Sequence, residues 1–337
     1  MTPRTTALVG LSAALVATAL WGFTFLGPAA VAPVNIYCLV LGRYAVFGLM
    51  SVAVLAARRD KLRALGARGV LTAMHLGVVG YIGFYLLLSM SASVGGGVLA
   101  STMTGLIPLM VSLISNALEK VFPWHRCLLP IGVISVGLFL VNGGADAFRA
   151  EGDGGGQLAA AGLGFAACLA WSYFVIANRI TMRRRAPVLD NSTWTACIGI
   201  GAFCGALPLL PLAASSGGTS PFAGPGTLGA FLSWCTAFAV LGSWCATWFW
   251  NIASRRLPST VTGPIIGMEA VFGAFFYLLW EQRIPAPHEL WGAVLVVGGV
   301  FVSFAVFGRS RVTHGPAAAG DEAARARERA DPRATRG

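Results

Sequence analysis

Charged side chains are scarce in this sequence of 337 residues. Asp, Glu, Lys and Arg together make up 11% of it, whereas a soluble domain carries about 25%. A hydrophobic content of 56% and a mean hydropathy of +0.73 accompany this scarcity. The composition excludes an ordinary soluble domain and indicates a protein embedded in a membrane.

The motifs of several chemical activities are also missing. The sequence contains no Walker loop, no HExxH pattern and no cluster of metal ligands, which excludes an ATP-driven pump within this chain and a zinc site. The seven cysteines are scattered through apolar stretches without a CxxC pair, and we interpret them as small buried residues. A lipid-modifying enzyme would need Asp, Glu or His clustered at one membrane face, and no such cluster is found. We expect no catalytic residues, no metal and no cofactor.

Apolar runs of about 20 residues are abundant, and that length crosses a bilayer as a helix. The runs are continuously apolar rather than alternating at every second residue, which argues against a strand barrel. We predict an all-α membrane protein with ten transmembrane helices. Their expected ranges are 6–26, 36–56, 70–91, 96–117, 127–143, 158–178, 192–213, 228–252, 260–280 and 290–308.

The net charge of +11 is distributed unevenly. With ten spans and a cytoplasmic N-terminus, nearly all Lys and Arg fall in inside segments, while the outside loops hold only Arg149 and Arg283. This asymmetry follows the positive-inside rule. It predicts a multi-pass protein of the plasma (inner) membrane with both termini cytoplasmic, and it explains the basic excess without nucleic acid.

The second half of the chain repeats the first half in outline. In each half an apolar helix is followed by a Glu, a Pro and a glycine-dotted apolar helix. Five spans per half is an odd number, so the copies would insert in opposite orientations, as in transporters that work by alternating access. We predict an inverted five-plus-five repeat: residues 1–144, an external linker at 145–156, a second repeat at 157–308 and a disordered cytoplasmic tail at 309–337. Matching pairs 162 positions apart include Gly80 and Gly242, Gly105 and Gly267, Glu119 and Glu281, and Pro123 and Pro285.

Short motifs in a fixed order resemble the EamA-type transporters of the drug/metabolite transporter superfamily. The run Leu20–Phe25 resembles the LWG-x-x-F ending of their first helix, and Arg43 resembles the arginine of their second. Glu269 lies in what resembles their second-half signature, although Ala270 stands where the family often has Pro, and Pro264 is expected to supply the kink. The resemblance covers residues 6–308. It implies ten helices in an inverted repeat, a central cavity and transport of small metabolites or drugs, often outward.

Three ionisable residues lie at membrane depth, where charges are costly and mark functional candidates. Burial favours the protonated form of a carboxyl group, so Glu269 could carry protons or bind a substrate amino group. The structural alternatives are that it pairs with Arg43 or bonds to backbone freed by a kink. Arg43 could bind a substrate carboxylate, pair with Glu269 or extend to the outer surface. His75 could shuttle protons or serve helix packing alone.

Aromatic side chains are the second set of candidates. An aromatic-lined cavity suits planar or amphipathic solutes, including aromatic amino acids, while the alternative role of such residues is packing or an interfacial belt. Trp250 lies nearer the cytoplasmic end, and we interpret it as a belt residue. The cavity candidates are Trp21, Tyr81, Tyr85, Trp171, Trp244 and Trp248.

These observations predict a secondary transporter, not an enzyme, that moves small metabolites by alternating access. The favoured hypothesis is an exporter of amino acids or related compounds with protons as the coupling ion. The runner-up is a multidrug or nucleoside-type carrier, and the alternative from another class is a non-transporting membrane scaffold or sensor. The expected partners are the lipid bilayer, a small-molecule substrate and protons, and the oligomeric state stays open.

Overall fold

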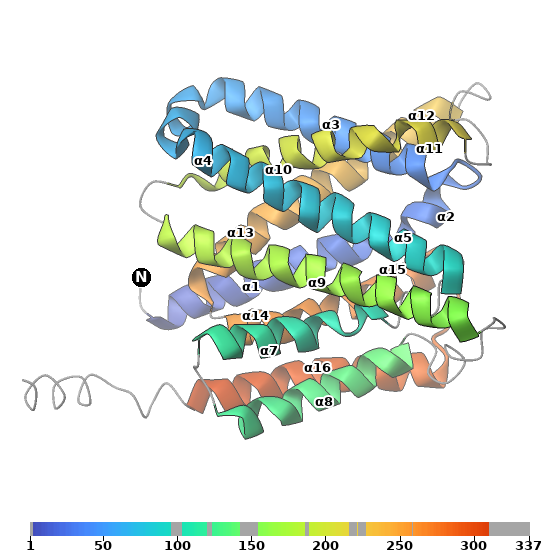
Figure 1. Ribbon diagram of the computed structural model, residues 1–337. Coiled ribbons are helices and arrows are strands. Elements are labelled where there is room, and N and C mark those ends of the chain that lie inside the picture. Colours follow the sequence, from blue (N-terminus) through green and yellow to red (C-terminus); the bar gives the residue numbers. More distant parts are fainter. Residues whose placement is uncertain are drawn as a thin grey trace, which may run out of the picture.

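The protein forms a bundle of long helices that run back and forth across its length, as the computed structural model shows (Figure 1). Residues 3–95, 103–119, 123–141, 154–185, 189–215, 221, 227–257 and 259–309 are described. Within them seven helices are long and apolar enough to cross a membrane, and three shorter apolar helices accompany them. The prediction of an all-helical membrane protein with ten helices is confirmed. The predicted tail lies outside the described residues, except for Arg309, and so does most of the predicted linker.

The first half supplies α1 (Pro3–Phe23), η1 (Thr24–Leu26), α2 (Gly27–Val31), α3 (Ile36–Ala57), α4 (Arg59–Gly77), η2 (Val78–Gly83), α5 (Phe84–Gly95), α7 (Ile107–Glu119) and α8 (Trp124–Val141). The second half supplies α9 (Gly154–Arg184), α10 (Asn191–Ala206), η4 (Leu207–Leu209), α11 (Leu210–Ser215), α12 (Thr227–Ala237), η5 (Phe238–Cys245), α13 (Ala246–Arg256), α14 (Ser259–Ile266), α15 (Met268–Glu281) and α16 (Pro287–Arg309).

Two helices contain a π-helical turn at matching places. The turn η2 joins α4 to α5, and the turn η5 joins α12 to α13. Gly80 lies in the first and Gly242 in the second, 162 positions apart. A π turn widens the helix locally and occurs often at functional sites. Hydropathy predicted both spans but carried no signal of these turns.

A break at Gly66 separates a surface segment from the third span. Gly66 has φ 70° and ψ 165°, a backbone conformation that glycine adopts without a steric penalty. Before the break, Arg59, Lys61 and Arg63 are exposed, while Leu65 is buried against the bundle. The break therefore lets a charged segment lie at the membrane surface while the apolar remainder of α4 enters the bundle.

The two halves of the chain are interleaved rather than side by side. The helix α8 packs against α16, α7 against α14, and α3 against α10, while α1 packs against α13 and α5 against α9. Trp21 on α1, Trp171 on α9 and Trp250 on α13 meet in the middle, with ring centroids 5.2 Å apart for Trp21 and Trp171 and 5.3 Å for Trp21 and Trp250. Because Trp250 is fully buried, its interpretation as an interfacial belt residue is wrong.

The bundle has two ends, which we call the N-terminal face and the opposite face. The N-terminal face holds the start of α1, the end of α3, the start of α10 and the ends of α9 and α13 (Figure 1). At this face Arg58 donates from Nη1 to both carboxylate oxygens of Asp190, at 3.0 Å each. The contact ties the end of α3 to the start of α10.

Asp190 also caps α10. Its Oδ2 accepts hydrogen bonds from the Thr193 backbone N–H at 2.9 Å and from the Thr193 hydroxyl at 2.7 Å. Partial burial alone would raise the pKa of Asp190, but these bonds and the Arg58 guanidinium outweigh it and hold the pKa below its ordinary value. The carboxylate therefore stabilises the fold above its unfolded pKa, and this contribution is lost as pH falls through the folded value.

We expect Asp190→Ala to destabilise the protein by about 1 kcal/mol through loss of the cap. Asp190→Asn keeps a capping acceptor and loses only the half-exposed ion pair with Arg58, which is worth about 0–1 kcal/mol. Thermal unfolding of both variants in detergent at neutral pH measures the difference. Equal stability of the two variants would show that the cap contributes nothing.

Candidate functional site

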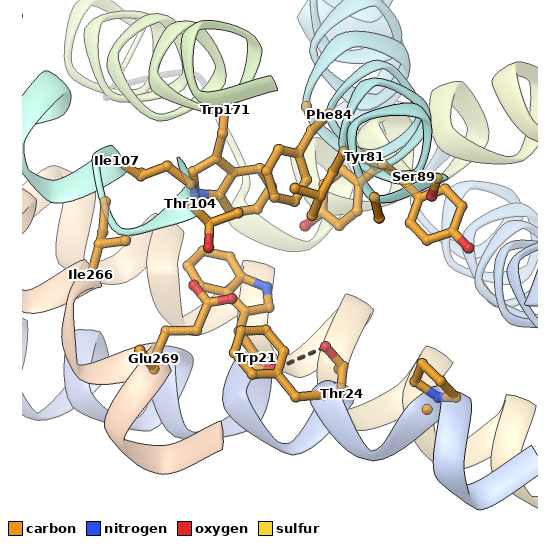
Figure 2. A pocket seen from close by; sticks show the side chains of 18 of the residues that line it. Trp21, Thr24, Tyr81, Phe84, Ser89, Thr104, Ile107, Trp171, Ile266 and Glu269 are labelled. Carbon is orange, nitrogen blue, oxygen red and sulfur yellow. Dashed lines mark hydrogen bonds between the residues drawn. The ribbon is translucent and has the colours of Figure 1, made fainter. Parts of the chain in front are cut away.

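A cavity of about 470 Å³ lies in the middle of the bundle. This volume is within the range of pockets that hold metabolite-sized ligands. Much of its lining comes from the end of α1, from η1 and α2, from the first half of α3, and from η2 and α5, and α7, α8, α9, α14 and α15 supply the rest. Figure 2 shows Trp21, Tyr81, Phe84, Trp171 and Glu269 around this cavity. Its polar and aromatic lining residues are Trp21, Thr24, Phe25, Arg43, Tyr44, Tyr81, Phe84, Tyr85, Ser89, Thr104, Trp171 and Glu269.

Glu269 reaches the cavity because the ninth span breaks just before it. The helix α14 contains Pro264 and ends at Ile266, and the Gly267 N–H donates to the Pro264 carbonyl at 3.1 Å. Glu269 is thus in the first turn of α15, where the helix dipole favours a negative charge. Figure 2 shows its carboxylate pointing into the space beside Trp21.

Arg43 extends from α3 across to the π turn η5. Its Nε donates to the Ser243 hydroxyl at 2.8 Å, and its Nη2 donates to the Gly242 carbonyl at 3.2 Å. The guanidinium carbon also lies 5.4 Å from the centre of the Tyr44 ring, a cation–π distance. These contacts hold the charge inside the bundle rather than at its surface.

Arg43 and Glu269 line the same cavity but do not pair with each other. The Glu269 carboxylate makes no hydrogen bond or ion pair with any described residue. The sequence left open whether the two charges neutralise one another. In this structure each lines the cavity within electrostatic reach of the other, but no direct ion pair joins them in the described part of the chain.

Aromatic rings form one wall of the cavity. Trp171 contacts Trp21 edge to face, with centroids 5.2 Å apart, and lies 5.1 Å from Phe84. The Tyr81 ring contacts Trp171 at 6.0 Å, and the Tyr81 hydroxyl is hydrogen-bonded to Thr247. Interlocking rings of this kind make a rigid apolar wall that suits a flat or hydrophobic group.

Of the nine predicted site residues, six line this cavity and three lie elsewhere. His75 is exposed, with Nε2 3.2 Å from the Tyr173 hydroxyl on α9. Trp244 packs edge to face against Phe47. Trp248 donates from Nε1 to a serine hydroxyl at the start of α10. The six residues on the cavity are Glu269, Arg43, Trp21, Tyr81, Tyr85 and Trp171.

The sequence reasoning missed several lining residues. Ser89 follows Tyr81 and Tyr85 at intervals of four, so helical spacing from the two tyrosines could have identified it. Thr24 follows Trp21 after three residues and donates to its carbonyl at 2.7 Å (Figure 2). Thr104 precedes α7 and carried no comparable signal, because its place depends on how the chain turns there.

Comparisons with known proteins agree with this architecture. The model of the EamA-like transporter family matches residues 158–305. Inner membrane protein YtfF of Escherichia coli (strain K12) is 27% identical over 317 residues, covering 87% of this chain and 94% of that protein. A crystal structure whose title gives no function aligns with a TM-score of 0.71 at 17% identity, over 91% of this chain and 99% of that chain. The last similarity shows a shared fold.

Proposed function

We propose that this chain exports amino acids or closely related zwitterions in exchange for protons. Its residues 158–305 match the EamA-like transporter family, and this membership implies a multi-pass membrane protein that works as a secondary transporter. The observation that carries the proposal is the pair of opposite charges, Glu269 and Arg43, on one aromatic-walled cavity. Two unpaired charges of opposite sign in a cavity complement a solute that carries both.

Each group in the cavity is matched by its chemistry to one part of the amino acid. The Glu269 carboxylate binds the amino group, and the guanidinium of Arg43, whose Nη1 is not engaged by the described residues, binds the carboxylate. The wall made by Trp21, Trp171 and Phe84 receives the side chain. This arrangement favours amino acids with aromatic or large apolar side chains over small or acidic ones.

Exchange for protons follows from the single carboxylate. Glu269 can hold a proton or an ammonium group, but not both at once. A site that must release one cation before it binds the other couples their opposite movements. An inward proton gradient then drives the amino acid outward.

Two features support an inverted repeat with the N-terminal face in the cytoplasm. Exchanging the halves maps the packing of α1 on α13 onto that of α9 on α5, and it maps each of the pairs α8–α16, α7–α14 and α3–α10 onto itself. The basic residues at the ends of α3, α9 and α13 lie at the N-terminal face, as the positive-inside rule requires of a cytoplasmic surface. In this orientation the cavity opens outward.

Counterflow into proteoliposomes tests the proposal. Vesicles preloaded with unlabelled phenylalanine or leucine are expected to accumulate the labelled amino acid above protein-free vesicles, and an imposed pH gradient is expected to accelerate net flux. Flux of phenethylamine or of nucleosides without flux of any amino acid would instead support the multidrug or nucleoside-type carrier. Absence of flux for every solute would overturn the proposal.

A further inference from the structure

A buried cluster of polar side chains joins three helices between the cavity and the N-terminal face. We call Asn178 on α9, Trp194 and Thr195 on α10, and Asn251 on α13 the amide cluster; each is fully buried. Asn178 Nδ2 donates to Asn251 Oδ1 at 2.8 Å, and Asn251 Nδ2 donates to Thr195 Oγ1 at 3.0 Å. Trp194 Nε1 donates to Asn178 Oδ1 at 2.7 Å.

The polar groups of this cluster are not needed to fill the space between the three helices. Apolar residues of similar size would fill the same space without the cost of burying amides. One position before Asn251 on α13, the indole Nε1 of Trp250 is buried without a hydrogen-bond partner among the described residues. A buried donor in this state, on the same helix as one of two amides whose hydrogen bonds all stay within the cluster, indicates groups with a second use.

The place of the cluster in the repeat suggests that use. The sequence offset between a helix and its counterpart in the other half differs from one helix pair to the next, so each offset is taken from a matching residue. Trp21 on α1 and Trp171 on α9 are 150 positions apart, and Gly80 and Gly242 in the π turns are 162 apart. The N-caps of α3 and α10, Asn35 and Asp190, are 155 apart. The corresponding positions in the first half are Pro28 for Asn178, Leu39 for Trp194, Val40 for Thr195, Leu88 for Trp250 and Ser89 for Asn251.

All five of these first-half positions line the cavity. The amide cluster thus occupies, in the second half, positions that correspond to part of the first-half lining of the cavity. In an inverted repeat, exchanging the conformations of the halves closes the one and opens the other. We propose that the amide cluster is the cytoplasmic substrate-loading site of the transporter, closed on itself in this conformation. The inference rests on the proposed alternating-access function.

The chemistry of this site differs from that of the outward cavity. When the three helices part, two amides and a threonine hydroxyl lose their mutual hydrogen bonds and can bond to a solute, and the Trp250 N–H gains access to one. None of these groups carries charge, so the site accepts a zwitterion through hydrogen bonds alone. A substrate loaded here meets its ionic partners only after the protein turns outward.

Three arginine contacts seal the route from the N-terminal face. The ion pair of Arg58 with Asp190 joins α3 to α10. Arg255 Nη2 donates to the Leu189 carbonyl at 2.6 Å, which ties α13 to the segment before α10. Arg179 Nε donates to the Leu257 carbonyl at 3.1 Å, which ties α9 to the end of α13. These contacts hold together, at the N-terminal face, the same helices that carry the amide cluster.

Cysteine accessibility tests the proposal without a substrate. In a chain whose seven native cysteines are replaced by alanine, Thr195→Cys reports on the loading site and Ser89→Cys on the outward cavity. Ser112→Cys is the matched control, since Ser112 is buried on α7 against Gly263 of α14. A membrane-impermeant maleimide is applied to right-side-out and to inside-out vesicles.

We expect labelling of Thr195→Cys only from the cytoplasmic side, of Ser89→Cys only from outside, and of Ser112→Cys from neither. Adding Asn178→Ala removes two hydrogen bonds of the closed cluster. It is expected to raise the Thr195→Cys rate about tenfold and to lower the Ser89→Cys rate, since the population moves to the inward-open state. Trp194→Phe removes one of these bonds and is expected to give roughly a threefold change in the same direction.

Unfolding of the Asn178→Ala variant would expose Ser112→Cys as well, which distinguishes it from opening of the loading site. If Asn178→Ala does unfold the protein, the labelling rate of Thr195→Cys in the milder Trp194→Phe variant tests the proposal. A Thr195→Cys rate that neither Asn178→Ala nor Trp194→Phe changes would overturn the proposal, even if amino-acid counterflow is observed. Failed counterflow with the expected labelling pattern would overturn the substrate assignment and leave the loading site intact.

Discussion

Glu269→Gln is expected to abolish the acceleration of transport by a pH gradient and to weaken binding of amino acids roughly 10- to 150-fold, the scale of one charge-assisted hydrogen bond. Glutamine keeps the shape of the side chain but cannot take up a proton, and it offers an ammonium group only a neutral acceptor. Proteoliposome flux measured with and without an imposed gradient gives the first effect, and substrate competition gives the second.

The chain offers a matched control on the same helix. Glu281 is at the other end of α15, where its Oε2 accepts from Arg283 Nε at 2.7 Å, and it does not line the cavity. Glu281→Gln makes the same chemical change outside the transport route and is expected to retain coupling. If the Glu269→Gln variant still responds to the gradient as the wild-type protein does, Glu269 is not the coupling group.

Gly201→Ala is expected to destabilise the protein by about 1–3 kcal/mol, the typical cost of overpacking. A Cβ at Gly201 would lie 2.1 Å from the Met74 carbonyl oxygen and within 2.6 Å of two further Met74 backbone atoms. Backbone atoms cannot rotate aside, so α4 and α10 must separate. Gly77 faces the same seam from α4, where a Cβ would lie 2.1 Å from the Ile198 carbonyl oxygen.

Gly205→Ala is the control for this variant, one helical turn further along α10. Its nearest neighbours are side-chain atoms of Ile82 and Val78, at 3.1 and 3.3 Å, which can shift slightly. Thermal unfolding in detergent should therefore separate the two variants clearly. Equal unfolding temperatures would show that α4 and α10 do not approach as closely as described.

The helices were predictable because each span must satisfy its own backbone hydrogen bonds in lipid and therefore appears as a continuous apolar run. Their interruptions were less predictable. The π turns, the break at Gly66 and the extension of the first span through α2 to Val31 depend on contacts between helices. The fourth span was predicted from residue 96, but 96–102 are outside the described residues, so its start stays a prediction; Met103 and Thr104 are helical, and α7 begins at Ile107 after a turn.

The site residues were predictable where they carry a charge that is costly to bury, and unpredictable where packing between helices decides which side chain reaches the cavity. Glu269 and Arg43 stood out because few charges lie in the spans, and both line the cavity. Depth along one apolar span assigned Trp244 to the cavity and Trp250 to an interfacial belt, and neither assignment holds because packing between helices decides where each ring lies. The structure buries Trp250 against Trp21 and leaves Trp244 on Phe47. The roles of the cavity residues in transport stay predictions.

In the proposed inverted repeat, the contact between Trp21 and Trp171 lies at the centre of the exchange between the halves. In the proposed repeat each ring takes the place of the other, so the axis relating the halves passes between them, and an exchange of conformations leaves their contact in place. A solute thus meets the same two rings whichever face is open. In the proposed exchange the proton gradient sets the direction of net transport, and the groups off the axis, Glu269 and Arg43 among them, couple the solute to that gradient. In this proposal the two rings recognise the substrate in both conformations of the protein.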